Sequence, residues 1–430
     1  MSKLSSQNSL FGLPVIVAAL GYFVDIYDLL LFGIVRVPSL KDLGLNEQEV
    51  SAIGASIINW QMGGLLLGGI LWGVLGDKKG RLSVLFGSII TYSVANVLCG
   101  FIQDTSFMTA TDLYKYLRFI AGIGLAGELG AGITLVSEIL PKELRAIGTS
   151  LVAGIGLLGA VVAYFTVEIF GDWRIAYFVG GGLGFGLLLL RVGVIESGMF
   201  TDLSNQKHLV KGDFFSFFTN WERFKRYMKC IGIGLPTWFV IGILATFSNE
   251  FGKAFGIAEP IKPGLAIMWC YVGLAVGDLS SGFISHYFHS RKKAVAVLMA
   301  FAGVFSIIYL FAGVKTAFIL YSLCVLMGFG IGYWAMFVTI GAEQFGTNLR
   351  ATAATTVPNM VRGMVIIMTT LFTGFKTGSL DVFGWFQLTV PQLGVIGAGT
   401  LVGVLSYFLG FYSTLTVPET HGKDLDFVEE

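Results

Sequence analysis

Charged side chains are scarce in this chain. Asp, Glu, Lys and Arg make up only 13% of its 430 residues, whereas a soluble globular protein carries about a quarter. The shortage extends over the whole length, 55% of the residues are hydrophobic, and 58 are glycine. This composition excludes an ordinary soluble domain and predicts a membrane protein with many spans in the lipid bilayer. The net charge of +1 gives no reason to expect nucleic acid as a partner.

Several chemical signatures are also missing. The four cysteines, Cys99, Cys230, Cys270 and Cys324, have no paired spacing, so neither disulfides nor a metal site is expected. No phosphate loop or other nucleotide motif occurs, which disfavours ATP-driven transport. No nucleophile and base stand out, so an enzyme is not expected, and nothing calls for a cofactor. The first apolar stretch lacks a small-residue cleavage site, so we expect it to be retained as a helix.

Twelve apolar runs are long enough to cross a bilayer as helices. Six precede and six follow a polar, basic stretch from Thr201 to Lys229. The predicted spans are 13–35, 50–75, 82–102, 114–139, 147–170, 174–195, 230–250, 264–288, 292–313, 316–341, 352–376 and 391–415. They predict an all-α membrane protein with six-helix bundles in residues 1–200 and 230–430, and residues 201–229 as a cytoplasmic linker.

Basic residues cluster in the loops on one side of these spans. Besides the central stretch, they lie in three loops, at Lys78, Lys79 and Arg81, at Lys142 and Arg145, and at Arg291, Lys292 and Lys293. Cytoplasmic loops carry the excess of Lys and Arg, so this side and both termini are assigned to the cytoplasm of a bacterial inner membrane. The opposite loops are poorer, although Arg36, Lys41, Arg174, Lys253 and Lys262 are expected there.

A short internal repeat supports the division into two halves. "SEILPKELRA" (residues 137–146) aligns with "AEQFGTNLRA" (residues 342–351), which pairs Glu138 with Glu343 and Arg145 with Arg350. Each copy closes the fourth predicted helix of its half. Two parallel six-helix repeats around a central cavity are typical of transporters.

The loop after the second span carries a family motif. "GVLGDKKGRLSVL" (residues 73–85) resembles the motif of the major facilitator superfamily at Gly73, Asp77, Gly80 and Arg81. The equivalent second-half loop, "GFISHYFHSRKK", departs from it, with His286 in place of the usual acid. "VPETHGKDL" (residues 417–425) resembles the tail of sugar-porter-like members. The resemblance implies twelve helices and transport by alternating access, and we expect a monomer.

Three further stretches resemble the metabolite:proton symporter branch of that superfamily. They are "RFIAGIGLAGELGAGITLVSEILPKELRA", "DWRIAYF" and "RVGVIESGMF". The branch carries an acid–x–x–aspartate pair in its first helix, here Asp25 and Asp28, although its first acid is usually glutamate. The similarity is strong over the first half and weaker over the second. Among the members of this branch, the sequence most resembles the nutrient transporters of intracellular bacteria.

The resemblance implies a cytoplasmic latch between the halves. Asp77 would hold the outward-open state, Gly73, Gly80 and Arg81 would shape its turn, and the pairs Glu138–Arg145 and Glu343–Arg350 would extend the network. The alternative is a turn that serves only topology.

Asp25 and Asp28 stand three residues apart in an apolar run, so they share one face of a helix. Charged groups inside a membrane normally face a cavity and have partners. We expect a proton-coupling group of Asp25, Asp28, Arg118 and Glu128, since a carboxyl group removed from water can exchange a proton near neutral pH. The alternative is a permanent ion pair that only fixes packing.

Residues of the second half are candidates for substrate binding. Arg362 could clamp a carboxylate with its guanidinium fork, helped by Asn359, or could instead form an ion pair. Aromatic side chains often line pockets for organic molecules, and the candidates are Tyr22, Trp238, Tyr333 and Trp334. Packing against lipid or protein is their alternative role.

The sequence therefore favours proton-coupled import of a small polar metabolite, with an amino acid or a related carboxylated compound as the leading substrate. An exporter of a drug, metabolite or siderophore is the first alternative. The fifth predicted helix, "LVAGIGLLGAVVAYF", lacks the glycine–proline signature of such exporters. A receptor that does not transport is the second alternative.

Overall fold

The computed structural model describes residues 12–79, 81–127, 142–196, 214–346, 349–382 and 386–420. Within these ranges it describes all side chains except those of residues 13–14, 73–74, 76–79, 81–83, 85, 142–150, 193–196, 351 and 382.

The first half of the chain forms a bundle of long helices. They are α2 (Leu13–Asp42), α3 (Glu47–Lys79), α4 (Arg81–Cys99), α5 (Ala110–Leu125), α7 (Lys142–Phe170) and α8 (Trp173–Glu196). Helix α2 is longer than the predicted span 13–35, so Arg36 lies inside the helix and not in a loop.

The second half repeats this arrangement with shorter pieces. Its helices are α10 (Ser216–Thr219), α11 (Trp221–Phe239), the π-helical turn η1 (Val240–Ala245), α12 (Ser248–Ala254), α13 (Pro263–Phe288), α14 (Arg291–Phe311), α15 (Ala317–Gly330), α16 (Trp334–Glu343), α17 (Arg350–Gly363), α18 (Val365–Thr377) and α19 (Gly394–Thr416). Helix α11 begins at Trp221 and not at residue 230, so part of the predicted linker is helical. The domain bounds themselves stay a prediction.

The predicted fold class is confirmed. Nine helical segments of the described ranges are long and apolar enough to cross a membrane. Helix α4, helix α5 and the pair α17 and α18 account for the other three predicted spans. Large apolar side chains such as Ile169, Phe283 and Phe318 point outward, as a lipid-facing surface requires.

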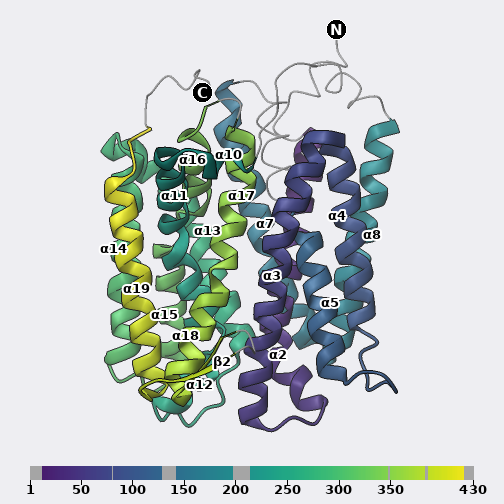
Figure 1. Cartoon of the computed structure of the whole chain (residues 1–430), viewed down its shortest axis with the longest axis vertical. Helices are drawn as coiled ribbons and strands as arrows, with labels where there is room; N and C mark the ends of the chain where they lie inside the picture. The colour runs from purple at the N-terminus through teal and green to yellow at the C-terminus, as the bar shows by residue number, and fades with distance from the viewer. Residues whose placement is uncertain are drawn as a thin grey trace.

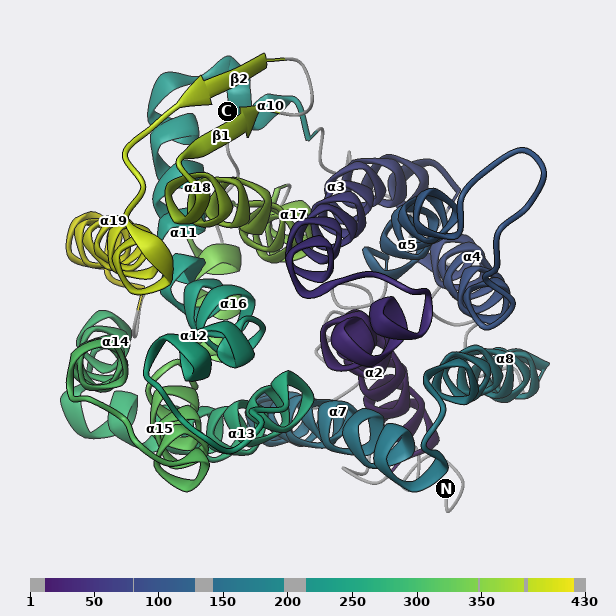
Figure 2. The same cartoon turned by 90° about the horizontal axis from the view of Figure 1, so that it is seen from below.

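The two groups of helices stand side by side, with the start of α2 and the end of α19 at the top (Figure 1). Seen from below, they meet where α3 packs against α17 and α18 and where α7 packs against α13 (Figure 2). At the bottom of Figure 1 lies a two-stranded antiparallel hairpin of β1 (Ser379–Val382) and β2 (Phe386–Thr389), in which Ser379 pairs with Thr389. We call this the hairpin end, and the opposite end the terminal end. The sequence did not predict the hairpin.

Glycines bring two helices of each half into backbone contact. A Cβ atom on Gly64 of α3 would lie 2.1 Å from the carbonyl oxygen of Phe119 in α5. In the second half, a Cβ atom on Gly273 of α13 would lie 2.0 Å from the carbonyl oxygen of Val325 in α15. Membrane helices use small residues for such close approach, and the matching contacts agree with an internal repeat.

Several helices of the second half are interrupted within their length. Helix α11 passes into η1, α15 and α16 are separated at residues 331–333, and α17 and α18 at Met364. Helices α2, α3, α7 and α8 of the first half run unbroken over their length.

Candidate functional site

Charged side chains are buried in the middle of the protein. Asp25 and Asp28 of α2, Arg118 of α5 and Arg362 of α17 are each 1% exposed or less. Taking ions out of water costs several kcal/mol for each ion. The partners of these four groups therefore indicate what the site can do.

Arg118 is held by neutral acceptors of the first half. Its Nε and Nη2 atoms donate to Oε1 of Gln61 at 3.2 and 3.0 Å, and Nη1 donates to Oδ1 of Asn96 at 2.8 Å. Nη2 also donates to the backbone oxygen of Asp28 at 2.9 Å, and the guanidinium lies 5.5 Å from the ring centroid of Tyr177. Arg118 thus lies beside Asp28.

The carboxyl group of Asp28 is enclosed by α2 and α8. Its oxygen atoms make no hydrogen bond of good geometry with the described residues, although the side chain of Asn96 in α4 lies near enough to interact with them. A Cβ atom on Gly180 of α8 would lie 2.4 Å from Oδ1 of Asp28. An ionised carboxylate without donors is costly in such a place, so the surroundings suit a neutral carboxyl group.

Asp25 reaches across to the second half. Its Oδ2 atom lies 3.6 Å from Nη2 of Arg362. Arg362 also donates from Nη1 to Oδ1 of Asn359 at 3.4 Å, and its Nε atom has no hydrogen-bond partner in the described part of the chain. Asn359 donates to the backbone oxygen of Ala126 at 3.0 Å. Arg362 and Asn359, the two polar candidates of the second half, thus both contact the first half.

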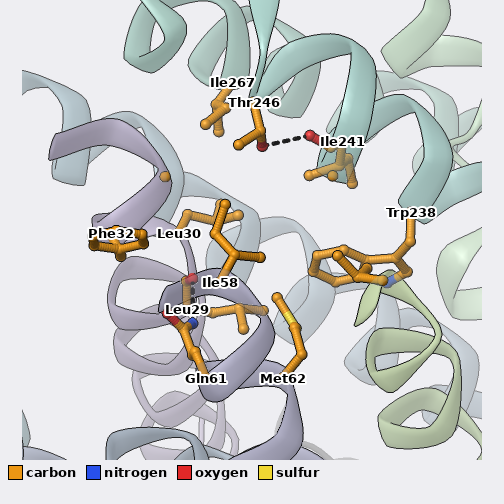
Figure 3. A pocket seen from close by; sticks show the side chains of 13 residues that line it. Leu29, Leu30, Phe32, Ile58, Gln61, Met62, Trp238, Ile241, Thr246 and Ile267 are labelled. Carbon is orange, nitrogen blue, oxygen red and sulfur yellow. Dashed lines mark hydrogen bonds between the residues drawn. The ribbon is translucent and has the colours of Figure 1, made fainter. Parts of the chain in front are cut away.

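A small cavity of about 30 Å³ lies between the halves next to this ion pair, far below the roughly 300–1,000 Å³ of small-molecule sites. A bound metabolite would therefore require the halves to separate here. Asp25 and Arg362 are one helical turn from Leu29 and Val365 in its wall. Gln61 and Thr246 are the polar side chains of a lining that is otherwise apolar apart from the indole N–H (Figure 3): Leu29, Leu30, Phe32, Gly33, Ile58, Gln61, Met62, Trp238, Ile241, Gly242, Thr246, Ile267 and Val365.

Trp238 is the aromatic candidate that faces the cavity. It is 3% exposed, and its Nε1 atom lacks a hydrogen-bond partner among the described groups. Trp334 packs edge-on against it at 6.4 Å between ring centroids. Tyr22 lies near enough to Asp25 and Arg362 to interact with their charges. Tyr333 is different, because its hydroxyl donates to the backbone oxygen of Ile233 at 3.2 Å and so packs inside the second half.

A second charged cluster closes the hairpin end. Glu250 of α12 lies between buried Arg36 of α2, at 3.8 Å, and Lys376 of α18, at 2.9 Å. Arg36 also donates to the backbone oxygen of Thr246 at 2.9 Å. Two exposed ion pairs join the halves at this end, Lys253 with Glu47 and Lys262 with Glu168. The hairpin end is closed in this structure.

The predicted latch is described only in part. Glu343 pairs with Arg291 of α14 at 2.8 Å and also interacts electrostatically with Arg350. Gly73 and Asp77 lie in the last turns of α3, Arg81 begins α4, and Arg145 lies in the first turn of α7. The side chains of Asp77, Arg81 and Arg145, and the whole of Gly80, Glu128 and Glu138, lie outside the described residues.

Sequence reasoning missed several polar residues of the site. Gln61, Asn96, Arg36 and Glu250 were not proposed, and neither was Asp278 of α13, whose Oδ1 atom accepts from the backbone N–H of Ala335 at the start of α16 (3.0 Å). Asp278 could have been found, because it is a lone acid in the apolar run "GLAVGDLSSG". The described ranges contain no cluster of three or more His, Cys, Asp or Glu that could hold a metal ion.

Comparison with known proteins gives four relevant likenesses. A family model described as the Major Facilitator Superfamily matches residues 18–370. A putative metabolite transport protein of Haemophilus influenzae is 29% identical, with 97% of this chain and 99% of that protein covered. The niacin transporter NiaP of Acinetobacter baylyi is 27% identical over 79% of this chain and 81% of its own. The structure of the proton:xylose symporter XylE bound to 6-bromo-6-deoxy-D-glucose has a TM-score of 0.71 at 16% identity, with 98% of both chains covered.

Proposed function

The chain belongs to the Major Facilitator Superfamily, and we propose that it imports a small carboxylate metabolite together with a proton. It is a membrane transporter of small metabolites and not an enzyme. We further propose that it works as a monomer in a bacterial inner membrane, with the terminal end in the cytoplasm. Residues 1–200 and 230–430 would then move as two bundles joined by residues 201–229.

The balance of charge among four buried residues carries this proposal. Asp25, Asp28, Arg118 and Arg362 are all buried, and as ions they sum to zero. A substrate carboxylate adds one negative charge to this set, and a proton restores neutrality. An uncompensated charge in such surroundings costs several kcal/mol. With Asp28 protonated the set carries one positive charge, which the substrate carboxylate neutralises, so the form that holds both the proton and the anion is favoured over the form that holds only the anion.

Each of the four residues has a distinct place in this scheme. Arg362 receives the substrate carboxylate, because its fork binds one in a bidentate manner and its Nε atom has no hydrogen-bond partner in the described part of the chain. Asp25 is its partner when the site is empty. Asp28 holds the proton, since its carboxyl group is fully buried and makes no hydrogen bond of good geometry with the described residues. Arg118, beside it, is the partner of Asp28 once the proton has left.

The cavity favours a substrate with a flat or apolar body. Its lining is mostly aliphatic, with the Trp238 ring on one side and no charged residue in the described wall. One similar protein is named for transport of niacin, which is a pyridine ring with a carboxylate. We therefore propose a ring-bearing monocarboxylate, with the carboxylate on Arg362 and the ring against Trp238. The ammonium group of an amino acid would find no acid in that wall.

Uptake by reconstituted protein tests the proposal. Proteoliposomes with an inside-alkaline pH gradient should accumulate nicotinate, and collapse of the gradient should stop accumulation. Arg362→Gln should lose uptake, whereas Lys225→Gln, in an exposed ion pair of α11, should retain it. Accumulation that is indifferent to the pH gradient would contradict proton coupling. Uptake of amino acids in place of nicotinate would contradict the ring-bearing substrate.

A further inference from the structure

Gln61 is the residue that touches both the Arg118 cluster and the cavity. Its Oε1 atom accepts from two nitrogens of Arg118, and its Nε2 atom donates to the backbone oxygen of Leu29 at 2.9 Å. It also lines the cavity (Figure 3), across from Trp238. The side chain is 2% exposed, so a change in its hydrogen bonds alters the environment of the residues around it.

Asn96 provides a natural comparison. Its Oδ1 atom also accepts from Arg118, at 2.8 Å, and it is also fully buried. It lies on α4, away from the cavity wall. The two amides therefore share the role of holding Arg118. Gln61 borders the cavity, whereas Asn96 lies beside the carboxyl group of Asp28.

We propose that Gln61 is a positioning residue that transmits the protonation state of Asp28 to the cavity. This inference rests on the assignment of the proton to Asp28 in the proposed function. Through Gln61, the proton on Asp28 can affect the cavity, which neither Asp25 nor Asp28 lines directly.

The path follows from the acceptors that are open to Arg118. While Asp28 is neutral, Arg118 bonds the amide oxygen of Gln61, as in this structure. When Asp28 loses its proton, the charge-assisted bond to the carboxylate is roughly twice as strong as a neutral one. Nη2 already reaches the backbone oxygen of Asp28, so a small rotation suffices. Gln61 is then released, and its oxygen becomes an acceptor at the cavity.

The released amide oxygen changes what the cavity offers. A buried acceptor without a partner is unfavourable, so it seeks a donor in the cavity. The indole N–H of Trp238 in the same wall lacks a described partner. A water molecule or a substrate could connect the two. The environment of Trp238 should therefore depend on the proton at Asp28.

Other titratable groups surround Asp28 and Arg118. They are Asp25 and Tyr27 on α2, Cys99 on α4, Tyr114 on α5 and Tyr177 on α8. Cysteine and tyrosine ordinarily ionise above about pH 8. Asp25 has its own partner in Arg362, and Asp25→Asn separates its contribution from that of Asp28.

Fluorescence of the ligand-free protein tests the proposal. The contribution of Trp238 is the difference in emission between the full chain and its Trp238→Phe variant, recorded from about pH 5 to about pH 9, where buried carboxyl groups can titrate. A sigmoidal change should appear in the otherwise unchanged chain. It should be lost in Asp28→Asn and in Gln61→Met, and it should persist in Asn96→Leu and Asp25→Asn, although its midpoint can move.

Gln61→Leu protects the test against a variant that fails to fold. Like methionine, leucine carries no amide oxygen for Arg118 to release, so the change should also be lost there. A flat profile in the otherwise unchanged chain, or a change that survives in either Gln61 variant, would overturn the proposal. No substrate is present in this experiment, so its result is independent of whether nicotinate is transported.

Discussion

One substitution at Glu250 should open the hairpin end of the protein. Its carboxylate lies 3.8 Å from Nη1 of Arg36 and 2.9 Å from Nζ of Lys376, and Lys376 also donates to Ser51 of α3 at 2.5 Å. Arg36 and Ser51 belong to the first half, whereas Glu250 and Lys376 belong to the second. Separation of the halves at this end would break the contacts that cross between them.

Glu250→Gln keeps the size of the side chain and removes its charge. Buried Arg36 would keep its bonds to Thr246 and Asn249 but would lose its acid partner. Loss of one partner of a buried ion pair costs about 3–5 kcal/mol, and this cost falls on the closed state. Since about 1.4 kcal/mol is a factor of ten, the equilibrium should shift toward opening by roughly a hundredfold or more.

Glu47→Gln is the matched control. Glu47 also pairs across the halves, with Lys253, but both side chains are more than 60% exposed. Such surface pairs contribute about 0–1 kcal/mol, so the shift should stay below about fivefold.

Labelling of an engineered cysteine measures the opening. Ile58→Cys places a thiol in the cavity wall, and the four native cysteines are buried. An impermeant maleimide, added at the hairpin end, should label this thiol at least about tenfold faster in Glu250→Gln than in its parent. Equal rates in a variant whose thermal unfolding is unchanged would refute the reasoning, because the carboxylate would not hold the end closed.

Three further substitutions probe the site. Arg362→Lys should weaken nicotinate binding through loss of the guanidinium fork, and Arg362→Gln should weaken it more; equal calorimetric affinities would make Arg362 a packing residue. Asp28→Asn should abolish gradient-driven uptake but spare exchange of labelled for unlabelled nicotinate, and retained accumulation would place the proton elsewhere. Gly180→Ala should lower the stability to thermal unfolding by about 1–3 kcal/mol, because its Cβ atom would lie 2.4 Å from Asp28. Gly182→Ala on the same helix meets open space and should not; a similar loss in both would contradict the close contact.

The number and order of the helices could be predicted because the bilayer imposes their length and apolar character. Their ends could not be predicted equally well. Helix α2 continues to Asp42 because its last turns pack within the protein, where Arg36 and Ser39 are buried. Hydropathy treats Arg36 as a loop residue, whereas the second half supplies its partners Thr246, Asn249 and Glu250.

Four charged residues of the site could be predicted from the sequence, although Arg36, Glu250 and Asp278 were missed. A lone aspartate or arginine in an apolar run is conspicuous, so the sequence pointed to Asp25, Asp28, Arg118 and Arg362. Neutral amides such as Gln61 and Asn96 are common in membrane helices and carry no comparable signal. The pairing of Asp25 with Arg362 was also beyond reach, because the two lie on different halves and only the tertiary structure brings them to 3.6 Å.

The first and second halves of the protein differ in how continuous their helices are beside the cavity. The proposed proton site draws its bonds from α2, α3, α4 and α5, and α2 and α3 run unbroken past the cavity. The bonds of Arg118 keep their lengths only while the helices that supply the acceptors stay in place. The second half carries its breaks at η1, between α15 and α16 and between α17 and α18. Helices yield most easily at such breaks, and π-helical turns are frequent at functional sites.

This difference constrains how the protein can open. Ile241, Gly242 and Thr246, within and next to η1, line the cavity, and Arg362 and Val365 flank the break at Met364. Bending at these two places would move the cavity wall and Arg362 without disturbing the bonds of Arg118. Alternating access would then combine a rigid first half, which keeps the proton site intact, with a flexible second half, which carries the substrate contacts between the two faces of the membrane.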